Sequence, residues 1–335
     1  MAAPAVTSPV IQALFVLLPN SLILDWAGPA EALRIANQCL VAQGQPERFA
    51  LQFVSPDTDA ASSVGAQLTG LQPLPSALTA HPATPHWVVL VGLPGATIAV
   101  DNAPARAVLH WLRGLRLATH HLELVTVCAG TLLAAHAGLL KGRRVTTHHQ
   151  HLDELRSVEP QCEVVANRVF VEDAPVYSSA GVTTGIDLVL QRIADTCGEP
   201  IAAQVAQTMV VALRRGPHDP ELSPFLSYRN HLHPALHRVQ DAVSLDPRAG
   251  WTVPRMADMA HTSPRHLTRL FMEYTQIAPL QYLRRIRLAV AQTALQSGHN
   301  VNHAAELAGF SSDTQLRRAW HQLGLPGAPS QARQR

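Results

Sequence analysis

A cysteine lies where the sequence changes from a strand pattern to a helix pattern. Residues 123–127 form an apolar run of strand length, Cys128 follows, and Ala129-Gly130 leads directly into a helical stretch. On such a turn a cysteine has the position of a nucleophile elbow, where a helix N-terminus lowers the thiol pKa and supplies backbone N–H donors. The alternative is a structural residue, because an isolated cysteine among apolar neighbours is commonly a small core side chain.

Histidines are the other residues that could do chemistry, and they form two groups. The groups are His148, His149 and His151, and His231, His233 and His237. Neither group has a cysteine or a carboxylate at a spacing typical of zinc sites, and no phosphate-binding glycine motif is present. We therefore expect no metal and no cofactor. The four cysteines show no CxxC spacing, which fits a reducing cytoplasm better than a disulfide framework.

The elements that must position Cys128 alternate between strand and helix. Apolar runs of strand length occur at 13–18, 50–54, 87–91 and 123–127, with helical stretches near 29–41, 104–117 and 131–140. This alternation predicts a doubly wound, flavodoxin-like α/β domain with a mostly parallel sheet and helices on both faces. Ligands of such folds bind beyond the carboxyl ends of the strands, which is where Cys128 is expected.

The C-terminal hundred residues show helical periods in place of strands. Apolar residues recur at helical spacing from 253 to 260 and from 267 to 274, with Ser263-Pro264 as an N-cap and first helical residue between them. The arrangement returns 49 residues later, with Gly309 at the turn and Leu316 in the place of Leu267. Two short helices around a tight turn are typical of a helix-turn-helix, so the sequence predicts an all-α domain with two such units.

Charge also separates the two parts of the chain. Residues 231–335 contain 12 Lys and Arg against 6 Asp and Glu, whereas residues 1–230 contain 14 against 18. A basic C-terminal block is the electrostatic footprint of a nucleic-acid-binding domain. Between the units, a longer helix carrying three arginines would hold two recognition helices at successive major-groove faces, about 34 Å apart.

Two long runs in this region, roughly residues 235–330, resemble the AraC-type DNA-binding domain. They are Ser263-Pro264-Arg265-His266-Leu267-Thr268-Arg269-Leu270-Phe271 and Ala305-Glu306-Leu307-Ala308-Gly309-Phe310-Ser311-Ser312. Gln276 departs from the pattern, because the family usually has glycine after the first recognition helix. The apolar stripes place Phe271 and Trp320 in the core rather than against bases.

The resemblance implies which side chains meet DNA. Outward residues of each second helix would read base edges, while arginines of the connecting helix and Arg318 would contact phosphates. The DNA-binding set is Arg265, His266, Thr268 and Arg269 in the first unit, Ser312, Asp313, Thr314, Arg317 and Arg318 in the second, and Arg284 and Arg285 on the connector.

The N-terminal part, about residues 10–200, resembles the class I glutamine amidotransferase-like (PfpI/ThiJ) domain. The matching segments are Leu24-Asp25-Trp26-Ala27-Gly28-Pro29, Val127-Cys128-Ala129-Gly130, Gly142-Arg143-Arg144-Val145-Thr146-Thr147-His148 and Tyr177-Ser178-Ser179-Ala180-Gly181-Val182. By position, Cys128 corresponds to the family's nucleophile, His148 to its histidine, and Asp25 to an acidic partner. The implied ligand-binding residues are Asp25, Gly92, Cys128, Ala129 and His148, with backbone donors of residues 92–95 facing the pocket.

Two functions fit this combination. The first is a sequence-specific DNA-binding transcription regulator whose N-terminal domain senses a small, nitrogen-containing metabolite. The alternative is an amidase-like or hydrolase-like enzyme that uses Cys128 and carries a DNA-binding tail. We favour the regulator, because turnover would destroy the signal that a sensor must bind and release. A third possibility, a DNA-binding scaffold with an inert N-terminal domain, would show no ligand response.

The expected organisation is a sensor domain at 10–212, a linker at 213–232 and a DNA-binding domain at 233–330. The expected partners are double-stranded operator DNA, a small-molecule effector, a second copy of the chain in a homodimer, and RNA polymerase. The apolar run at 13–18 is too short to span a bilayer and no basic residue precedes it, so we expect neither a signal peptide nor a membrane helix, and a cytoplasmic location.

Overall fold

The computed structural model describes residues 9–211, 214–217, 219, 221, 223–229, 231–325 and 327–334. The chain divides into two compact units, Met1–Glu221 and Leu222–Arg335, so the boundary falls inside the segment 213–232 that was expected to be a linker. Described residues of that segment have structural roles, because Arg215 hydrogen-bonds to the first unit and α7 (Pro224–Ser227) belongs to the second. Among the described residues, no helix is both long and apolar enough to cross a membrane.

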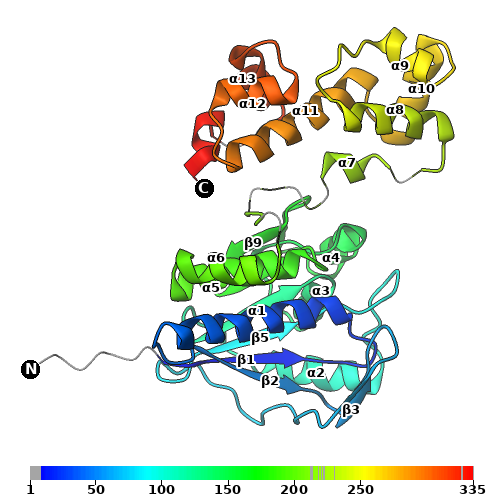
Figure 1. The fold of residues 1–335 in the computed structure, drawn as a ribbon. Coiled ribbons are helices and arrows are strands. Elements are labelled where there is room, and N and C mark those ends of the chain that lie inside the picture. Colours follow the sequence, from blue (N-terminus) through cyan, green and yellow to red (C-terminus); the bar gives the residue numbers. More distant parts are fainter. Residues whose placement is uncertain are drawn as a thin grey trace, which may run out of the picture. The chain divides into compact units, whose positions relative to one another are not determined.

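A six-stranded sheet with the strand order β2-β1-β5-β6-β10-β9 forms the centre of the first unit (Figure 1). Neighbouring strands pair in parallel, except that β9 and β10 are antiparallel. The bounds are β1 (Ile11–Val16), β2 (Phe49–Val54), β5 (His86–Leu90), β6 (Leu122–Val127), β9 (Phe170–Asp173) and β10 (Val176–Ser179). The pairs β3 (Asp59–Ala61) with β4 (Gln67–Thr69) and β7 (Arg144–Val145) with β8 (Glu163–Val164) lie outside this sheet. The predicted doubly wound, mostly parallel sheet is confirmed.

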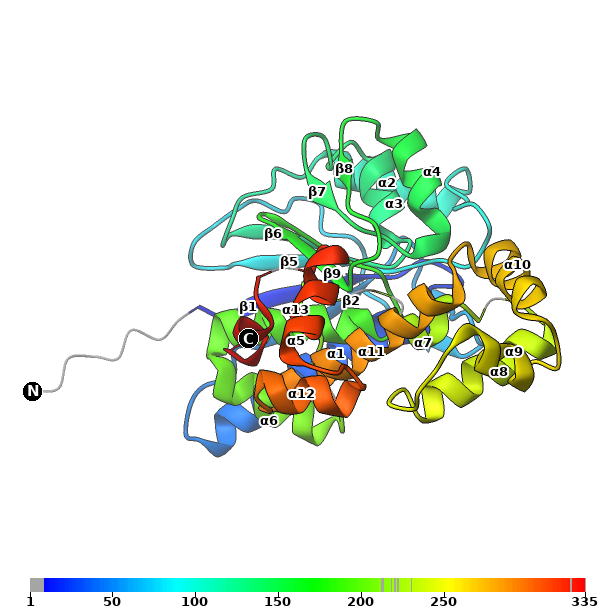
Figure 2. The same cartoon turned by 90° about the horizontal axis from the view of Figure 1, so that it is seen from above.

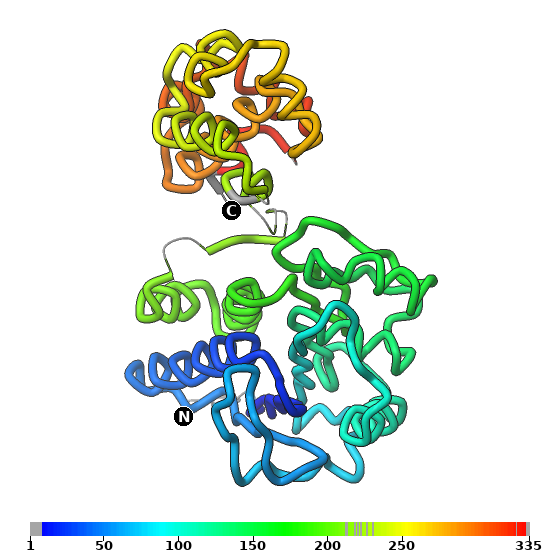
Figure 3. The backbone as a smooth tube through the Cα atoms, turned by 90° about the vertical axis from the view of Figure 1, so that its right-hand side faces the viewer, coloured from blue at the N-terminus to red at the C-terminus, as the bar shows by residue number. Residues whose placement is uncertain are grey.

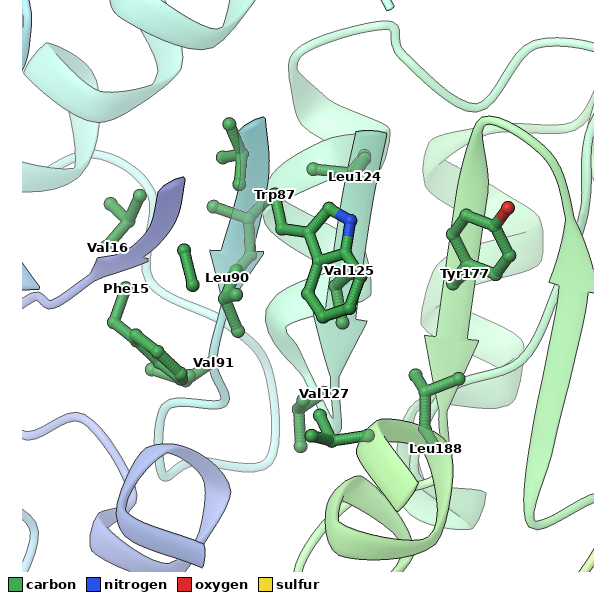
Figure 4. Packing of buried hydrophobic residues seen from close by; sticks show 14 of the residues in the cluster. Phe15, Val16, Trp87, Leu90, Val91, Leu124, Val125, Val127, Tyr177 and Leu188 are labelled. Carbon is green, nitrogen blue, oxygen red and sulfur yellow. The ribbon is translucent and has the colours of Figure 1, made fainter. Parts of the chain in front are cut away.

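Helices cover both faces of the sheet, as Figures 2 and 3 show. On one side lie α1 (Ile23–Ala42), α5 (Thr184–Cys197) and α6 (Glu199–Thr208), and on the other α2 (Ala103–Arg113), α3 (Gly130–His136) and α4 (Leu152–Val158). Because both faces are covered, the central strands are mostly apolar, and every residue of β6 is buried, including the polar Glu123 and Thr126. Trp87, Val125 and Tyr177 lie side by side in this core (Figure 4), and the Arg192 guanidinium stacks on the Tyr177 ring at 3.8 Å.

The prediction for the start of the first helix was wrong. The sequence pattern placed the helical stretch near 29–41, but α1 begins at Ile23 and includes Pro29. Its first turn is fixed by tertiary contacts, because the Asp25 carboxylate accepts the backbone N–H groups of Gly92 and Val182. The α2 and α3 helices end at Arg113 and His136, each four residues before the predicted end.

The second unit is all-α across its described residues, and its helices form two small cores. The helices are α8 (Pro234–Leu245), α9 (Val253–Met259), α10 (Pro264–Thr275), α11 (Pro279–Gln296), α12 (Val301–Ala308) and α13 (Asp313–Gln322). The long α11 helix contributes Tyr282 and Ile286 to the first core and Ala291 and Leu295 to the second. Each helix pair, α9–α10 and α12–α13, therefore has its own core, as the predicted double helix-turn-helix requires.

Helix ends in this unit follow the chemistry of the sequence. Ser263 and Ser312 accept the N–H groups of His266 and Gln315, each at 3.2 Å, as N-caps. Gly309 has a φ of +80°, and a Cβ there would lie 2.6 Å from Arg248 Cα, so this turn requires glycine. Gln276 ends α10 in the left-handed region at a φ of +59°, the conformation for which the family's glycine is suited.

Candidate functional site

Cys128 lies in the turn between β6 and α3, at the carboxyl ends of the parallel strands. Its φ of +57° is unusual for a residue other than glycine, and it is 4% exposed. The backbone is held on both sides, since Cys128 N–H donates to Ser179 O at 3.0 Å and Thr147 Oγ1 donates to Cys128 O at 2.8 Å. A left-handed residue fixed in this way is often found in functional turns, and it lies between the strand and the helix that the sequence predicted.

Two glycines make room for the cysteine side chain. A Cβ on Gly92 would lie 2.9 Å from Cys128 Cβ, and one on Gly181 would lie 2.7 Å from Cys128 Sγ. Gly92 was predicted as a site residue, whereas Gly181 was not assigned to the site. Its signal in the sequence was its place in the segment 177–182 that carries the family resemblance, but only the fold shows that it packs on the thiol.

Asp25 is the immediate polar neighbour of the thiol. The carboxylate is fully buried, and it accepts N–H groups from Gly92 at 3.0 Å and Val182 at 2.8 Å. Burial raises the pKa of Asp25, while these two backbone hydrogen bonds and one with the Cys128 side chain oppose that shift. The structure thus brings together three predicted residues, Asp25, Gly92 and Cys128.

The environment holds Cys128 as a neutral thiol, which differs from the expectation for a helix N-terminus. Burial raises the pKa of the Cys128 thiol far above its ordinary value, the Asp25 and Glu221 carboxylates raise it further, and a hydrogen bond from Ala129 N–H only partly opposes this. One predicted backbone donor is also occupied, because Gly92 N–H donates to the Asp25 carboxylate at 3.0 Å. The lowering of the thiol pKa that the N-terminus of α3 would cause is therefore outweighed by desolvation and by two negative charges.

His148 lies near this turn but has other neighbours. Its ring centroid is 4.2 Å from that of His149 and 6.2 Å from that of His151. Burial and these two histidines lower the pKa of His148 to about 4. Within the described part of the chain, the His148 ring forms no hydrogen bond with Cys128, although Thr147 beside it is bonded to the Cys128 carbonyl. A cysteine–histidine pair is thus not formed, and the side-chain partner of the thiol is Asp25.

Glu221 is a site residue that the sequence did not reveal. Its Oε1 accepts His149 N–H at 3.1 Å and lies 2.8 Å from His149 Nδ1, and its side chain is 6% exposed. One ring nitrogen each of His148 and His149 and one carboxylate oxygen of Glu221 lie within 4.8 Å of one another. No local pattern could indicate this, because Glu221 follows His149 by 72 residues. No carboxylate stands at a spacing typical of zinc sites in the sequence, and the fold supplies one from a distant part of the chain.

The second histidine group has a packing role. Among the described residues, His231, His233 and His237 do not form a metal-type cluster with any acidic residue or cysteine. The His231 ring lies 4.8 Å from His237 and 5.6 Å from Tyr274, and the His237 ring contacts the carbonyl of His231. These contacts hold the entry of the second unit against α8 and α10.

The candidate DNA-reading surface of the first helix-turn-helix is the outer face of α10. Arg265 and Arg269 are exposed, whereas His266 and Thr268 are half-buried. The Arg269 guanidinium lies 2.9 Å from His266 Nδ1, and Thr268 Oγ1 donates to Pro264 O at 2.9 Å. The Thr268 hydroxyl is thus engaged with its own helix, while both guanidinium groups face outward.

The second helix-turn-helix presents an equivalent face on α13. Ser312, Thr314, Arg317 and Arg318 are exposed, and Asp313 is half-buried, whereas the core is formed by Leu316, Ala319 and Trp320. Arg317 Nε lies 3.3 Å from Asp313 Oδ2, and Arg317 lowers the pKa of that carboxyl. Arg318 makes no side-chain contact among the described residues, so its charge is unpaired there.

The three arginines of the connecting helix α11 have different surroundings. Arg284 is exposed and donates to Gln322 Oε1 at 3.1 Å. Arg285 is half-buried against Tyr228, donating to its hydroxyl and lying over its ring. Arg287 donates to the carbonyls of Pro247 and Ala249 at 2.8 and 3.0 Å and so has a structural role. Of the two phosphate contacts predicted on this helix, Arg284 and Arg285, Arg284 is the more accessible.

Comparison with known proteins matches both units of the chain. Residues 14–195 match the DJ-1/PfpI family, and residues 256–335 match a helix-turn-helix domain. The HTH-type transcriptional regulator CdhR of Pseudomonas aeruginosa is 27% identical over 329 residues, covering 95% of this chain and 90% of that protein. The HTH-type transcriptional regulator GlxA of Rhizobium meliloti is 27% identical over 310 residues, covering 92% and 91%.

A solved structure resembles the chain in fold. A ThiJ/PfpI family protein from Pseudomonas syringae has a TM-score of 0.50 at 19% identity, covering 76% of this chain and 90% of that one. At this level of identity the likeness concerns the α/β architecture alone.

Proposed function

Because the chain belongs to the DJ-1/PfpI family and is a DNA-binding transcription regulator with an AraC-type helix-turn-helix domain, we propose that its α/β unit senses a small, nitrogen-containing metabolite. The effector site is the Cys128 turn, with Asp25, Gly92, Ala129 and His148. The observation that carries this proposal is the buried Asp25–Cys128 pair at the carboxyl ends of the strands, the usual ligand position in doubly wound folds.

The charges around the turn favour a ligand with N–H or cationic groups. Two carboxylates, Asp25 and Glu221, act on the Cys128 thiol, and His148 is neutral at pH 7 because its pKa is lowered to about 4. A buried carboxylate gains most from a charged or strongly polar N–H donor. This is the physical basis for a nitrogen-containing effector.

The same surroundings disfavour the enzyme alternative. Acyl transfer needs a thiolate, a general base within reach and free donors for the oxyanion. Here the thiol is held neutral, its partner is an acid, and the Gly92 N–H already donates to Asp25. We therefore propose binding and release without turnover.

A thermal-shift screen of amino acids, quaternary amines and related metabolites tests the proposal. The wild type, Cys128→Ala and Asp25→Asn are compared, and an effector at 100 times its Kd stabilises the wild type by about 2.7 kcal/mol. We expect the shift to be lost or reduced in both variants. No shift for any compound with any of the three proteins contradicts the sensor function.

A cavity at the opposite ends of the strands supplies the control for the location of the effector. It has a volume of about 340 Å³, lies at the amino ends of the strands, and is lined by Arg48, Trp87 and Arg192 among others. Arg48→Met alters this cavity and leaves the Cys128 turn unchanged. A shift that survives Cys128→Ala and disappears in Arg48→Met would place the effector there and overturn the proposed site.

The proposed DNA contacts complete the function. Arg265, Arg269 and Arg317 read base edges, helped by Ser312, Asp313 and Thr314, while Arg284 and Arg318 contact phosphates. We further propose that the regulator acts in the cytoplasm as a homodimer, since paired operator sites multiply affinity, and that it contacts RNA polymerase.

A further inference from the structure

The residues that precede the second unit are tied to the α/β unit at several points. We call the described residues of 214–221 the strap. Arg215 binds the buried Asp187 carboxylate through its backbone N–H at 3.0 Å and its guanidinium at 2.6 Å, and it donates to Thr183 Oγ1 at 2.8 Å. Asp219 O accepts Val169 N–H at 3.0 Å. These contacts fix the part of the strap that precedes Glu221 to the rest of the α/β unit.

Glu221 lies at the end of the strap beside two histidines that are also fixed. His149 approaches it with both the backbone N–H and Nδ1, and the His148 ring stacks beside His149 at 4.2 Å. In the part of the chain that the structure describes, the His148 ring makes no hydrogen bond, so neither of its ring nitrogens has a partner there. The carboxylate is 6% exposed, which makes an unshared negative charge costly there.

We propose that His148, His149 and Glu221 form a binding site for one divalent transition-metal ion, with Zn²⁺ as the reference. Two imidazole nitrogens and one carboxylate oxygen suit this class of ion, at metal–ligand distances of about 2.0–2.2 Å. The three ligand atoms lie within 4.8 Å of one another, whereas a tetrahedral site needs roughly 3.3 Å between them. Small rotations of the histidine rings close this difference, and with its proton on Nε2 the His149 ring offers Nδ1 to the ion.

The ion would join the strap to residues 148–149, which are otherwise connected to Glu221 by the two hydrogen bonds of His149. The second unit begins one residue after Glu221, so metal binding fixes the point from which the DNA-binding unit departs. This regulatory consequence rests on the proposed sensor function, whereas metal binding itself does not. The test below therefore uses neither effector nor DNA.

Zinc binding to the metal-free full-length chain tests the site, measured by competition with a chromophoric chelator and by the visible spectrum of bound Co²⁺. We expect one ion per chain at the tightest site, and an affinity loss of roughly tenfold or more in His148→Gln and in Glu221→Gln. His148→Gln leaves the His149–Glu221 hydrogen bond intact, so it separates loss of a ligand from loss of the strap contact. Glu221→His retains a ligand and should restore binding.

Because the chain has 18 histidines, a control variant is needed at a histidine–carboxylate pair outside the proposed site. Glu306→Gln removes the acidic member of an exposed pair on α12, in which Glu306 Oε2 lies 3.8 Å from His303 Nδ1. This variant should bind zinc as the wild type does, and zinc should slow amide exchange in residues 214–221 of both. Equal zinc affinity in the wild type, His148→Gln and Glu221→Gln would overturn the proposal, whether or not an effector is found.

Discussion

At the scale of single residues, the surroundings of Cys128 decide its chemistry. The turn gives the thiol a left-handed backbone and a helix N-terminus, features shared with catalytic cysteines. Burial, Asp25 and Glu221 nevertheless raise its pKa, and Ala129 N–H is the one opposing contact among its described neighbours. A buried group responds to the sum of its electrostatic neighbours, so a residue type at a familiar turn does not by itself define a nucleophile.

Slow alkylation of Cys128 is the direct consequence. At pH 7.5 the native chain should react with iodoacetamide at Cys128 more slowly than the urea-unfolded chain, because the raised pKa leaves little thiolate and the side chain is 4% exposed. The rate should keep rising with pH above the ordinary thiol pKa of about 8.5. Mass spectrometry of the Cys128 peptide measures it, with the half-buried Cys39 as the internal reference.

Asp25→Asn provides a matched variant for this measurement. Removing the charge that raises the thiol pKa should increase the alkylation rate of Cys128 at pH 7.5. A native rate equal to the unfolded rate, with no effect of Asp25→Asn, would mean that the thiolate is accessible and would favour the enzyme alternative.

At the scale of elements, helix ends explain why the second unit follows its sequence closely. Ser263, Ser312 and Gly309 act within one turn of their own positions, through caps or a left-handed residue. Gln276 is the exception, since it occupies a left-handed position without being glycine. Its side chain donates to Glu273 O at 3.1 Å, which offsets part of the backbone strain.

Gln276→Gly should therefore stabilise the second unit. Relief of the left-handed conformation should stabilise the folded chain by about 1–2 kcal/mol. Glycine's greater freedom in the unfolded chain offsets about 0.5–1 kcal/mol of this, so a net gain in stability of roughly 0.5–1 kcal/mol is expected. Urea denaturation followed by α-helical circular dichroism measures it. Gln281→Gly, at the third position of α11, serves as the contrast and should be destabilising, because it lowers helix propensity and removes the hydrogen bond that Gln281 Oε1 accepts from Ala278 N–H. A loss of stability in Gln276→Gly would show that the side-chain hydrogen bond outweighs the strain.

The outer face of α10 can be tested by comparing a base reader with a phosphate contact. Arg269→Ala should cost roughly 1–3 kcal/mol on the operator and little on unrelated DNA, because base contacts carry the discrimination. Arg284→Ala, on the connecting helix, should weaken both complexes by similar amounts. Fluorescence anisotropy with the two DNAs measures the difference. Equal losses on both DNAs for Arg269→Ala would reassign that residue to the phosphate backbone.

At the scale of the whole molecule, charge is divided between the units. Lys and Arg outnumber Asp and Glu in residues 231–335, whereas the reverse holds in residues 1–230, so the second unit carries the attraction to DNA. The strap, which precedes this unit, carries Glu221, and Glu221 and Asp25 are the two carboxylates that raise the pKa of the Cys128 thiol. An effector changes DNA binding only if it stabilises one arrangement of the units over another.

Salt dependence measures the electrostatic part of DNA binding. Affinity should fall steeply between 50 and 200 mM salt, by roughly 10³-fold for a dimer that neutralises about six phosphates. Arg284→Ala should reduce the slope of log affinity against log salt by about 1 per subunit contact. An affinity that stays flat across this range would contradict the assignment of the basic face to DNA.

The sequence by itself determined the elements that depend on near neighbours. Apolar spacing and caps within one turn specified α9, α10, α12 and α13, and alternating runs specified the central parallel strands and the Cys128 turn. These features depend on interactions between residues a few positions apart, which leave periodic patterns in the chain.

The tertiary structure alone decided the chemistry of the sensor turn. Asp25 fixes the early start of α1, Gly181 packs on Cys128, and Glu221 meets His149 across 72 residues of chain. Those contacts decide which titratable groups are buried together and therefore the protonation state of each group. Burial and electrostatic energies sum over neighbours in space, and neighbours in space that are distant in sequence leave no local pattern.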